Sequence, residues 1–434
     1  MTPEAVPPTR PTQVELKGKH LETVRRYTDE FTWDEIFPFV TGPRRQELMK
    51  LISSLYPDLL TEEDARALLS CETYRFAAVA NGHGARKPDA AEWPKLNADF
   101  TDSLKKRIES LPDTYRVRIS LPSFPKQVES ALTITADVRI VIAAAPVGKT
   151  ASEKSGLSSL ARALSDMHQP LQSFLEIDVS GFCDGSASSS AAGRCISTAK
   201  QCSFLLTAHG AAHDEWSEKV ASATFAPSPY TSSDADFEMP AGLGRCFGRL
   251  VASESNWIVF GGGRGLATSL LGSGRKPETE SERIDAFKTS LFPVGRFLDC
   301  RGHRDFTSIA AAMEWHQDSL WADNQTFAYL AACIGLEAVL GSDGHMEGMS
   351  RRLADRYAFL VGRGRAEREE LVKQYDEVLN LRGRLVHAKA ARLKSKDEGL
   401  LRRAQAMLMR VIWHEMHEMY RTIEKEKEAP GALG

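Results

Sequence analysis

The chain has 434 residues, of which 42% are hydrophobic and 26% are charged, and its formal net charge is −3. This is the composition of an ordinary globular protein, and the length predicts two or three domains. No run of about 18 apolar residues occurs, so no membrane span is expected. The proline-rich start has no apolar signal region, and the seven cysteines form no C-x-x-C motif. We therefore expect a cytoplasmic protein with reduced thiols.

The first quarter of the chain is predicted to be mainly helical. Residues 1–18 are polar and rich in proline, and we expect them to be disordered. Residues 19–111 contain stretches such as RRQELMKLISSLY and TEEDARALLSCETYRFAAVA, whose pattern favours helices. This region is therefore expected to be a helical part of the protein that precedes a different fold.

Residues 112–310 show a different period and predict a mixed α+β domain. TYRVRISLP alternates and ALTITADVRIVIAAA is a long β-branched run, so each is expected to form one strand. GLSSLARALSDMHQPLQSFLEI predicts a helix followed by the start of a strand. CDGSASSSAAGRC is expected to be a loop of small residues, and CSFLLTAHG and SNWIVFGGG to be two further strands.

Two glycine-containing stretches are weak candidates for nucleotide sites. AAAPVGKT ends in Gly148, Lys149 and Thr150, but Ala143 stands where a phosphate-binding loop needs glycine. FGGGRG (260–265) fits a flexible turn after a strand better than an anion site. A nucleotide-dependent enzyme centred on Lys149 stays an alternative, and it would require magnesium.

Histidine pairs do not complete a metal site in the sequence. His414 and His417 miss the spacing of zinc peptidases, and His209 and His213 have no visible third ligand. RGHRD (301–305) fits an exposed polar turn before the next helix. We therefore predict no metal and no other cofactor.

Four amphipathic helices are predicted between residues 320 and 425, before a flexible tail at 426–434. The first two are QTFAYLAACIGLEAVLG, which Gly341 would end, and GMSRRLADRYAFLVG, with Ser350 as its N-cap and Gly362 as its end. The third and fourth are expected at about 366–387 and 397–424. The expected apolar face of the first helix is Phe327, Leu330, Ile334, Ala338 and Val339, and the expected core residues of the third and fourth include Leu371, Tyr375, Val378, Leu379, Leu385, Leu400, Leu401, Ala404, Leu408, Val411 and Ile412.

Short connections and the absence of interior proline favour an up-and-down bundle for these helices. The expected fold class is therefore α+β, with a helical and mixed α/β N-terminal region that senses or recruits. The all-α C-terminal bundle would follow it as the effector.

The third of these helices ends in LNLRGRLVHAK, which places Arg382 and His387 with four residues between them. An arginine can neutralise charge that builds on a phosphate, and a histidine can move the proton of a 2′-hydroxyl or of a leaving oxygen. The alternative is structural: His387 would cap the helix C-terminus, and Arg382 would pair with Glu377 or Glu398.

Residues five apart on an ideal α-helix differ by about 140° around its axis, so Arg382 and His387 would not share one face. Two geometries would still bring them to one site. The helix ends at His387 and lets the imidazole turn, or each residue works with its counterpart across the two-fold axis of a homodimer.

This C-terminal pattern resembles the HEPN superfamily, most closely its ApeA-like branch. The likeness covers about a quarter of the chain: an apolar first helix with an acid (Glu337 in GLEAVLG), a glycine-closed second helix and a third ending in RGRLVHA. It implies a metal-independent endoribonuclease acting as a homodimer, often in antiphage defence or as a toxin. Catalytic roles would fall to Arg382 and His387, with Arg384 and Glu337 at the site. Gly383 departs from the pattern, where a small polar residue is more usual.

The segment around this motif is strongly basic. Between Leu381 and Arg410 the chain has nine basic and two acidic residues, a local charge of +7 in a chain of net charge −3. Such a segment attracts a phosphate backbone, and Lys389 and Arg384 are its nearest candidates for substrate binding. The alternative is a solvated loop between two helices.

From these observations we expect a ribonuclease that leaves 2′,3′-cyclic phosphate and 5′-hydroxyl ends. RNA, a second copy of the chain and a phage-derived or nucleotide trigger at the N-terminal region are the expected partners. The alternative is a catalytically inactive HEPN module that binds RNA or dimerises as a scaffold.

Overall fold

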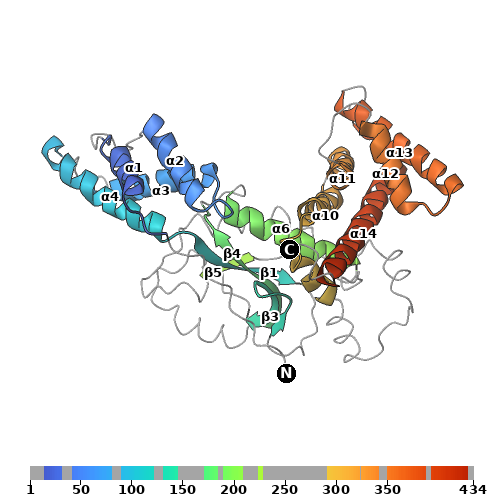
Figure 1. The fold of residues 1–434 in the computed structure, drawn as a ribbon, viewed down its shortest axis with the longest axis horizontal. Coiled ribbons are helices and arrows are strands. Elements are labelled where there is room, and N and C mark those ends of the chain that lie inside the picture. Colours follow the sequence, from blue (N-terminus) through green and yellow to red (C-terminus); the bar gives the residue numbers. More distant parts are fainter. Residues whose placement is uncertain are drawn as a thin grey trace, which may run out of the picture. The chain divides into compact units, whose positions relative to one another are not determined.

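The computed structural model describes residues 14–31, 42–80, 89–121, 131–144, 171–183, 189–208, 223–227, 291–322, 324–341, 349–387 and 392–428. The chain divides into two compact units. The N-terminal unit comprises residues 1–120, 136–196 and 221–253, and the C-terminal unit comprises residues 121–135, 197–220 and 254–434. The fold is α+β, with helices predominating over one small sheet (Figure 1).

Four helices gather in the N-terminal unit: α1 (Lys19–Thr28), α2 (Pro43–Leu55), α3 (Glu62–Ala80) and α4 (Trp93–Glu109), the last preceded by the 3₁₀ turn η2 (Ala90–Glu92). Apolar side chains from all four form one core that includes Val24, Ile52, Leu68, Phe100 and Leu104. The helices predicted from RRQELMKLISSLY and TEEDARALLSCETYRFAAVA are confirmed as α2 and α3.

The sheet has five strands in the order β2-β3-β4-β1-β5. These are β1 (Asp113–Leu121), β2 (Ala131–Thr133), β3 (Val138–Ala144), β4 (Leu171–Gly181) and β5 (Ala223–Pro227), and the pairs β1–β5 and β3–β4 are antiparallel. TYRVRISLP is confirmed as β1, and the predicted strand start after MHQP is confirmed as β4. ALTITADVRIVIAAA forms two strands rather than one, and β5 was not predicted.

Helix α6 (Ser190–Ala208) contradicts two predictions from the sequence. The end of CDGSASSSAAGRC is helical rather than a loop, and CSFLLTA continues the same helix rather than forming a strand. Its buried residues recur at helical spacing: Ala191, Ala192, Cys195, Ala199, Cys202 and Leu205. A short apolar run such as CSFLL does not by itself distinguish a strand from a buried helix, and the small residues before it extend the helical period.

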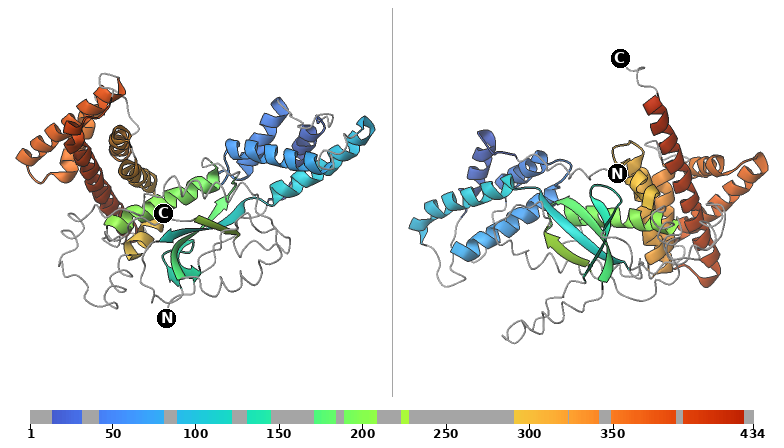
Figure 2. Two further views of the ribbon diagram at one scale, coloured as in Figure 1. Left: turned by 180° about the vertical axis from the view of Figure 1, so that it is seen from behind. Right: turned by 90° about the horizontal axis from the view of Figure 1, so that it is seen from below.

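The C-terminal unit contains α10 (Phe306–Trp321), α11 (Gln325–Leu340), α12 (Met349–Val361), α13 (Arg365–Val386) and α14 (Glu398–Glu428), with the 3₁₀ turn η4 (Ser395–Asp397) before α14. These helices lie side by side in Figures 1 and 2. The four predicted helices are confirmed as α11–α14, and α10 packs against α11 and α14 as a further member. RGHRD is a turn directly before α10, as expected.

The ends of these helices follow ordinary capping rules. Oδ1 of Asn324 accepts hydrogen bonds from the backbone N–H groups of Thr326 and Phe327, so Asn324 is the N-cap of α11. Gly341 and Gly362 end α11 and α12 as predicted. The prediction that Ser350 caps α12 is wrong, because the helix already begins at Met349.

The predicted apolar face of α11 is partly wrong. Phe327 is 71% exposed and Ile334 is 37% exposed. The buried face instead includes Ala328, Tyr329, Ala332, Cys333, Leu336 and Val339. Because α11 is apolar nearly all round, its period alone does not select the face that packs. Gly335 decides it: a Cβ at this position would lie 2.6 Å from Cδ2 of Leu408, so glycine permits the close approach of α14.

The predicted core of α13 and α14 is confirmed in part, because Leu379, Leu385, Leu400 and Leu401 are only half-buried. Buried residues include Leu371, Tyr375 and Val378 on α13, and Ala404, Leu408, Val411 and Ile412 on α14. Among the helices that the structure describes, none combines the length and hydropathy that crossing a membrane requires. The six described cysteines are free thiols.

Candidate functional site

Arg382 and Glu337 form an ion pair between α13 and α11. Nη2 of Arg382 donates a hydrogen bond to Oε2 of Glu337 over 3.1 Å, and about a third of each side chain is exposed. The two residues are 45 positions apart in sequence. Arginine has five N–H donors, and no other donor of Arg382 has a protein partner among the described residues. The guanidinium is therefore held at one edge, with further donors free to contact an anion.

His387 stands at the end of α13. It is the C-cap residue, with φ −89° and ψ 19°, and its backbone N–H donates to the carbonyl oxygens of Gly383 and Leu385. The side chain is exposed and forms no hydrogen bond or ion pair within the described part of the chain. The helix thus ends at the histidine, which is the first of the two geometries considered above. No direct contact joins the imidazole to Arg382 among these residues.

Neither structural pairing considered for Arg382 occurs. Glu377 pairs with Arg403 of α14, and Glu398 accepts a hydrogen bond from Gln325. Arg382 reaches across to α11 instead. Arg384 is exposed on the last turn of α13, and Lys389 lies outside the described residues.

A layer of buried polar side chains lies beneath the Arg382–Glu337 pair. Cys333, one turn before Glu337, is 1% exposed, and burial, with a further contribution from Glu337, raises the pKa of its thiol to about 12. Burial also raises the pKa of Tyr329, whose hydroxyl donates to the carbonyl of Val378 over 2.6 Å. These groups are neutral near pH 7, so the chemistry of the pair rests on its guanidinium and carboxylate.

Tyr375 belongs to this layer and was predicted only as a core residue. It lies seven residues before Arg382 on α13, about two helical turns, and therefore on the same face. Burial raises the pKa of Tyr375, Cys333 and Glu337 raise it further, and Arg382 lowers it. The spacing from Arg382 was the only signal in the sequence that linked this tyrosine to the site.

The basic segment that follows α13 is exposed where it is described. Exposed cations include Arg384, Arg392, Lys394, Lys396, Arg402 and Arg410. The backbone N–H of Leu393 donates to Oγ1 of Thr326 over 2.9 Å, which fixes this segment against the first turn of α11. The cations nearest to Leu393 are therefore held beside the first turn of α11.

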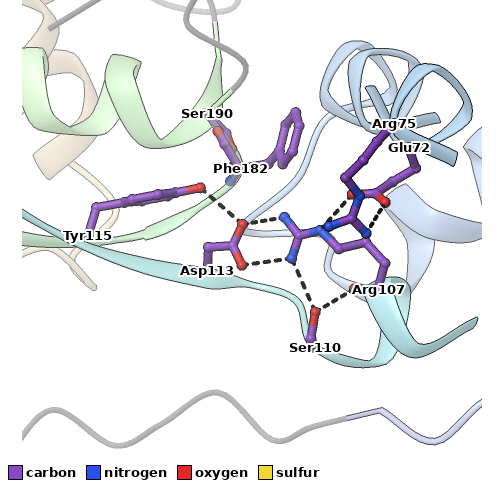
Figure 3. A network of polar contacts seen from close by, with 8 residues as sticks. All are labelled: Glu72, Arg75, Arg107, Ser110, Asp113, Tyr115, Phe182 and Ser190. Carbon is purple, nitrogen blue, oxygen red and sulfur yellow. Dashed lines mark hydrogen bonds and ion pairs between the residues drawn. The ribbon is translucent and has the colours of Figure 1, made fainter. Parts of the chain in front are cut away.

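A second charged cluster lies in the N-terminal unit (Figure 3). The guanidinium of Arg107 donates to both carboxylate oxygens of Asp113, and its Nε lies 3.4 Å from Oε1 of Glu72. Tyr115 donates to Asp113 over 3.0 Å, and Arg75 pairs with Glu72. Burial alone would lower the pKa of Arg107, but Asp113 and Glu72 raise it overall. Each charged side chain of this cluster has an oppositely charged partner. The cluster therefore holds α3, α4 and β1 together and leaves no charged group free to bind a ligand.

Other candidate sites contribute less. Within the described ranges, no group of three or more histidine, cysteine or acidic side chains is placed to hold a metal. His414 and His417 are exposed on α14, where Nδ1 of His417 lies 2.7 Å from the carbonyl oxygen of Trp413. Lys149, FGGGRG, His209 and His213 lie outside the described residues.

The exposed end of α13, with Arg382, Glu337 and His387, is thus the strongest candidate site on the described chain. Comparison of the chain with protein-family models, curated proteins and solved structures finds no match.

Proposed function

We propose that the C-terminal helices form a metal-independent endoribonuclease of the HEPN type, with Arg382 and His387 as its catalytic residues. The observation that carries the proposal is the state of Arg382, which a single hydrogen bond to Glu337 holds in place while its other donors stay free among the described residues. An oriented guanidinium of this kind suits a phosphate, because charge-assisted and bidentate hydrogen bonds form without reorganisation. The exposed imidazole of His387 supplies the group that moves protons.

The proposed reaction is a transesterification at an RNA phosphodiester. An imidazole takes the proton of the 2′-hydroxyl, and the 2′-oxygen attacks phosphorus. The bond from phosphorus to the 5′-oxygen then breaks, and an imidazolium gives that oxygen its proton. Arg382 stabilises the extra negative charge on the phosphorane, and Arg384 holds a neighbouring phosphate. The products are a 2′,3′-cyclic phosphate and a 5′-hydroxyl, and no metal takes part.

A homodimer suits this reaction. In-line displacement requires a base and an acid on opposite sides of phosphorus. In an isologous dimer, one copy of His387 would be the base and the other copy the acid. An apolar stripe on α11 supports such a dimer: Phe327 is 71% exposed, Ile334 is 37% exposed, and Leu330 is half-buried between them. This stripe lies on the helix that carries Glu337. A phage-derived or nucleotide trigger acting through the N-terminal unit remains part of the same proposal.

The decisive experiment incubates total RNA with the protein in EDTA and maps the ends of the products. Wild type is expected to leave cyclic phosphates. His387→Ala is expected to slow cleavage by about 10² to 10⁴-fold, and Arg382→Ala by about 10² to 10³-fold. His417→Ala and Arg403→Ala are the matched controls, because they remove another histidine and another paired arginine from the same unit.

If both site variants fold and cleave at the wild-type rate, the assignment of Arg382 and His387 is wrong. Salt-dependent RNA binding or dimerisation without cleavage by any form would instead support the inactive scaffold.

A further inference from the structure

The first half of α14 is basic and contains no acidic residue. Residues 399–414 include three arginines and one histidine, and no aspartate or glutamate. Residues 415–428, in contrast, include five glutamates, one arginine and two lysines. A solvated helix usually carries charges of both signs, which stabilise it in pairs three or four residues apart. The first half of α14 lacks such pairs within itself, so its charge calls for a different explanation.

Two of these arginines share one face of α14 with a tryptophan. At about 100° per residue, Arg410 lies about 80° and Trp413 about 20° from Arg402 around the helix axis. The buried residues Ala404 and Leu408 lie on the opposite side. Arg402 and Arg410 are exposed, and Trp413 is half-buried. The indole is thus held in the surface of the unit while part of it stays accessible on the face that carries the two cations.

The two exposed arginines of this face pair with no described carboxylate. Arg403 instead pairs with Glu377 of α13, and Glu415 pairs with Arg356 of α12 over 2.8 Å. These two ion pairs join α14 to neighbouring helices, which explains Arg403 and Glu415 structurally. No such contact explains Arg402 and Arg410. An exposed guanidinium that no carboxylate neutralises keeps donors for a phosphate.

This face begins near the candidate site. Glu377, the partner of Arg403, lies five residues before Arg382 on α13, which is about 7.5 Å along the helix axis. From Arg402 to Trp413 the face extends about 16 Å along α14. Since stacked nucleotides of one strand are about 3.4 Å apart, this length accommodates about five of them.

We propose that this face of α14, with Arg402, Arg410 and Trp413, binds single-stranded RNA next to the cleavage site. The two guanidinium groups bind phosphates, and a base stacks on the indole. A duplex suits the face less well, because its bases already stack on one another. Every base has a flat face, so the contact does not depend on sequence. This role deepens the proposed ribonuclease function and rests on it for the identity of the ligand.

Binding of a strand that cannot be cleaved tests the stacking contact apart from the chemistry. The probe is a short fluorescent 2′-O-methyl oligouridylate, which has no 2′-hydroxyl to attack phosphorus, and its abasic counterpart has the same phosphates without bases. Trp413→Leu is expected to weaken binding of the oligouridylate about tenfold and to leave binding of the abasic strand unchanged. Trp413→Phe keeps an aromatic ring and is expected to retain most of the affinity.

The arginines are tested by salt dependence. Changing both Arg402 and Arg410 to glutamine is expected to weaken binding of both strands. The slope of log affinity against log salt should flatten by about 1.4, which is about 0.7 for each phosphate that is no longer neutralised. Both side chains are exposed, so this variant is expected to fold as wild type does. Changing Arg421 and Lys425, two exposed cations in the acidic half of the same helix, to glutamine is the control and should leave the slope unchanged.

Four results would overturn the proposal. The first is a wild-type protein that does not bind the oligouridylate, and the second is an unchanged salt slope in the variant of Arg402 and Arg410. The third is a Trp413→Leu variant that folds and binds both strands as wild type does. The fourth is a variant of Arg402 and Arg410 that loses self-association in sedimentation and still binds RNA normally, because the basic half of α14 would then contact the acidic half in a second copy.

The same assay keeps the two proposals apart. If the α14 variants lose affinity as expected and no form of the protein cleaves RNA, only the ribonuclease proposal fails. If RNA is cleaved through Arg382 and His387 while the α14 variants bind the oligouridylate as wild type does, only the role of α14 fails.

Discussion

Nη2 of Arg382 and Oε2 of Glu337, 3.1 Å apart, connect the end of α13 to the end of α11. The bond restricts a long side chain that carries a full positive charge at the exposed end of α13. It also neutralises a carboxylate that would otherwise repel a phosphate. Glu337 thus orients the guanidinium while it competes with the ligand, and a weak, partly exposed pair is the useful compromise between these two effects.

Replacing Glu337 by glutamine separates orientation from folding. Because the pair is about a third exposed, Glu337→Gln is expected to lower the free energy of unfolding by less than about 1 kcal/mol. Cleavage of RNA is expected to fall about tenfold, since Arg382 loses its fixed orientation. Urea unfolding and a single-turnover cleavage assay give the two numbers.

Glu369→Gln is the matched control, because Glu369 pairs with Arg365 on the same helix and both are far more exposed. Glu369→Gln should alter neither the free energy of unfolding nor the rate of RNA cleavage. A Glu337→Gln variant that cleaves at the wild-type rate would show that Arg382 needs no tether.

The basic segment predicts a salt dependence. Arg392, Lys394 and Lys396 are exposed, and changing all three to glutamine removes three cations that can each neutralise a phosphate. The slope of log affinity for single-stranded RNA against log salt is expected to flatten by about 0.7 for each phosphate that is no longer neutralised. Fluorescence anisotropy over a salt series measures it. As a control, changing Arg351, Arg363 and Arg365, which lie outside this segment, to glutamine should leave the slope unchanged. If the variant at Arg392, Lys394 and Lys396 also keeps the wild-type slope, the basic segment is a solvated loop that does not bind RNA.

The C-terminal helices were predictable because their local signals agree with one another. A helical period, closing glycines and uninterrupted lengths mark α11–α14. The same signals did not select the buried face of α11, because the helix is apolar on several sides and Gly335 determines its packing through a residue on α14. This packing brings together two segments that are far apart in the sequence, so the pattern of either segment by itself does not predict it.

The contacts within the candidate site were likewise not predictable from local sequence patterns. Arg382 and His387 were candidates from their spacing and Glu337 from the family resemblance, but the bond between Arg382 and Glu337 is a tertiary contact. Tyr375 was predicted as core and is core, and nothing local indicated that its hydroxyl is unpaired. Helix α6 was missed because short apolar runs with small residues fit a strand, a loop or a buried helix equally well.

Two glycines give opposite predictions for stability. A Cβ at Gly335 would lie 2.6 Å from Cδ2 of Leu408 and 3.0 Å from Cβ of Trp315, and Leu408 is fully buried. Gly335→Ala is therefore expected to destabilise the fold by about 1 to 3 kcal/mol, although alanine favours the helix. A Cβ at Gly383 would meet nothing within 4 Å, so Gly383→Ala is expected to stabilise α13 by about 0.5 to 1 kcal/mol.

Urea unfolding of the two variants measures both effects. Stabilisation by Gly335→Ala would mean that α11 and α14 pack less closely than described. A destabilising Gly383→Ala would mean that this turn of α13 requires glycine for a reason other than space.

His316 on α10 predicts how stability depends on pH. It is 2% exposed, its Nδ1 atom has no hydrogen-bond partner among the described residues, and its ring lies edge-on to Phe204 with 5.2 Å between centroids. Burial lowers the pKa of His316 to about 4. An imidazole in the unfolded chain titrates near about 6.5. Between these two values the unfolded chain binds a proton that the folded protein does not.

The contribution of His316 to stability is therefore fully present above about pH 6.5 and is lost as the pH falls toward about 4, by on the order of 3 kcal/mol in total. His316→Leu removes this titration, so the difference in unfolding free energy between variant and wild type should change with pH across that window and become constant above it. Urea unfolding at several pH values measures the difference. His414→Gln, an exposed histidine of the same unit, is the control and should follow wild type at every pH. A His316→Leu variant that parallels wild type throughout would mean that His316 acquires a proton in the folded state, and hence that a partner reaches its ring.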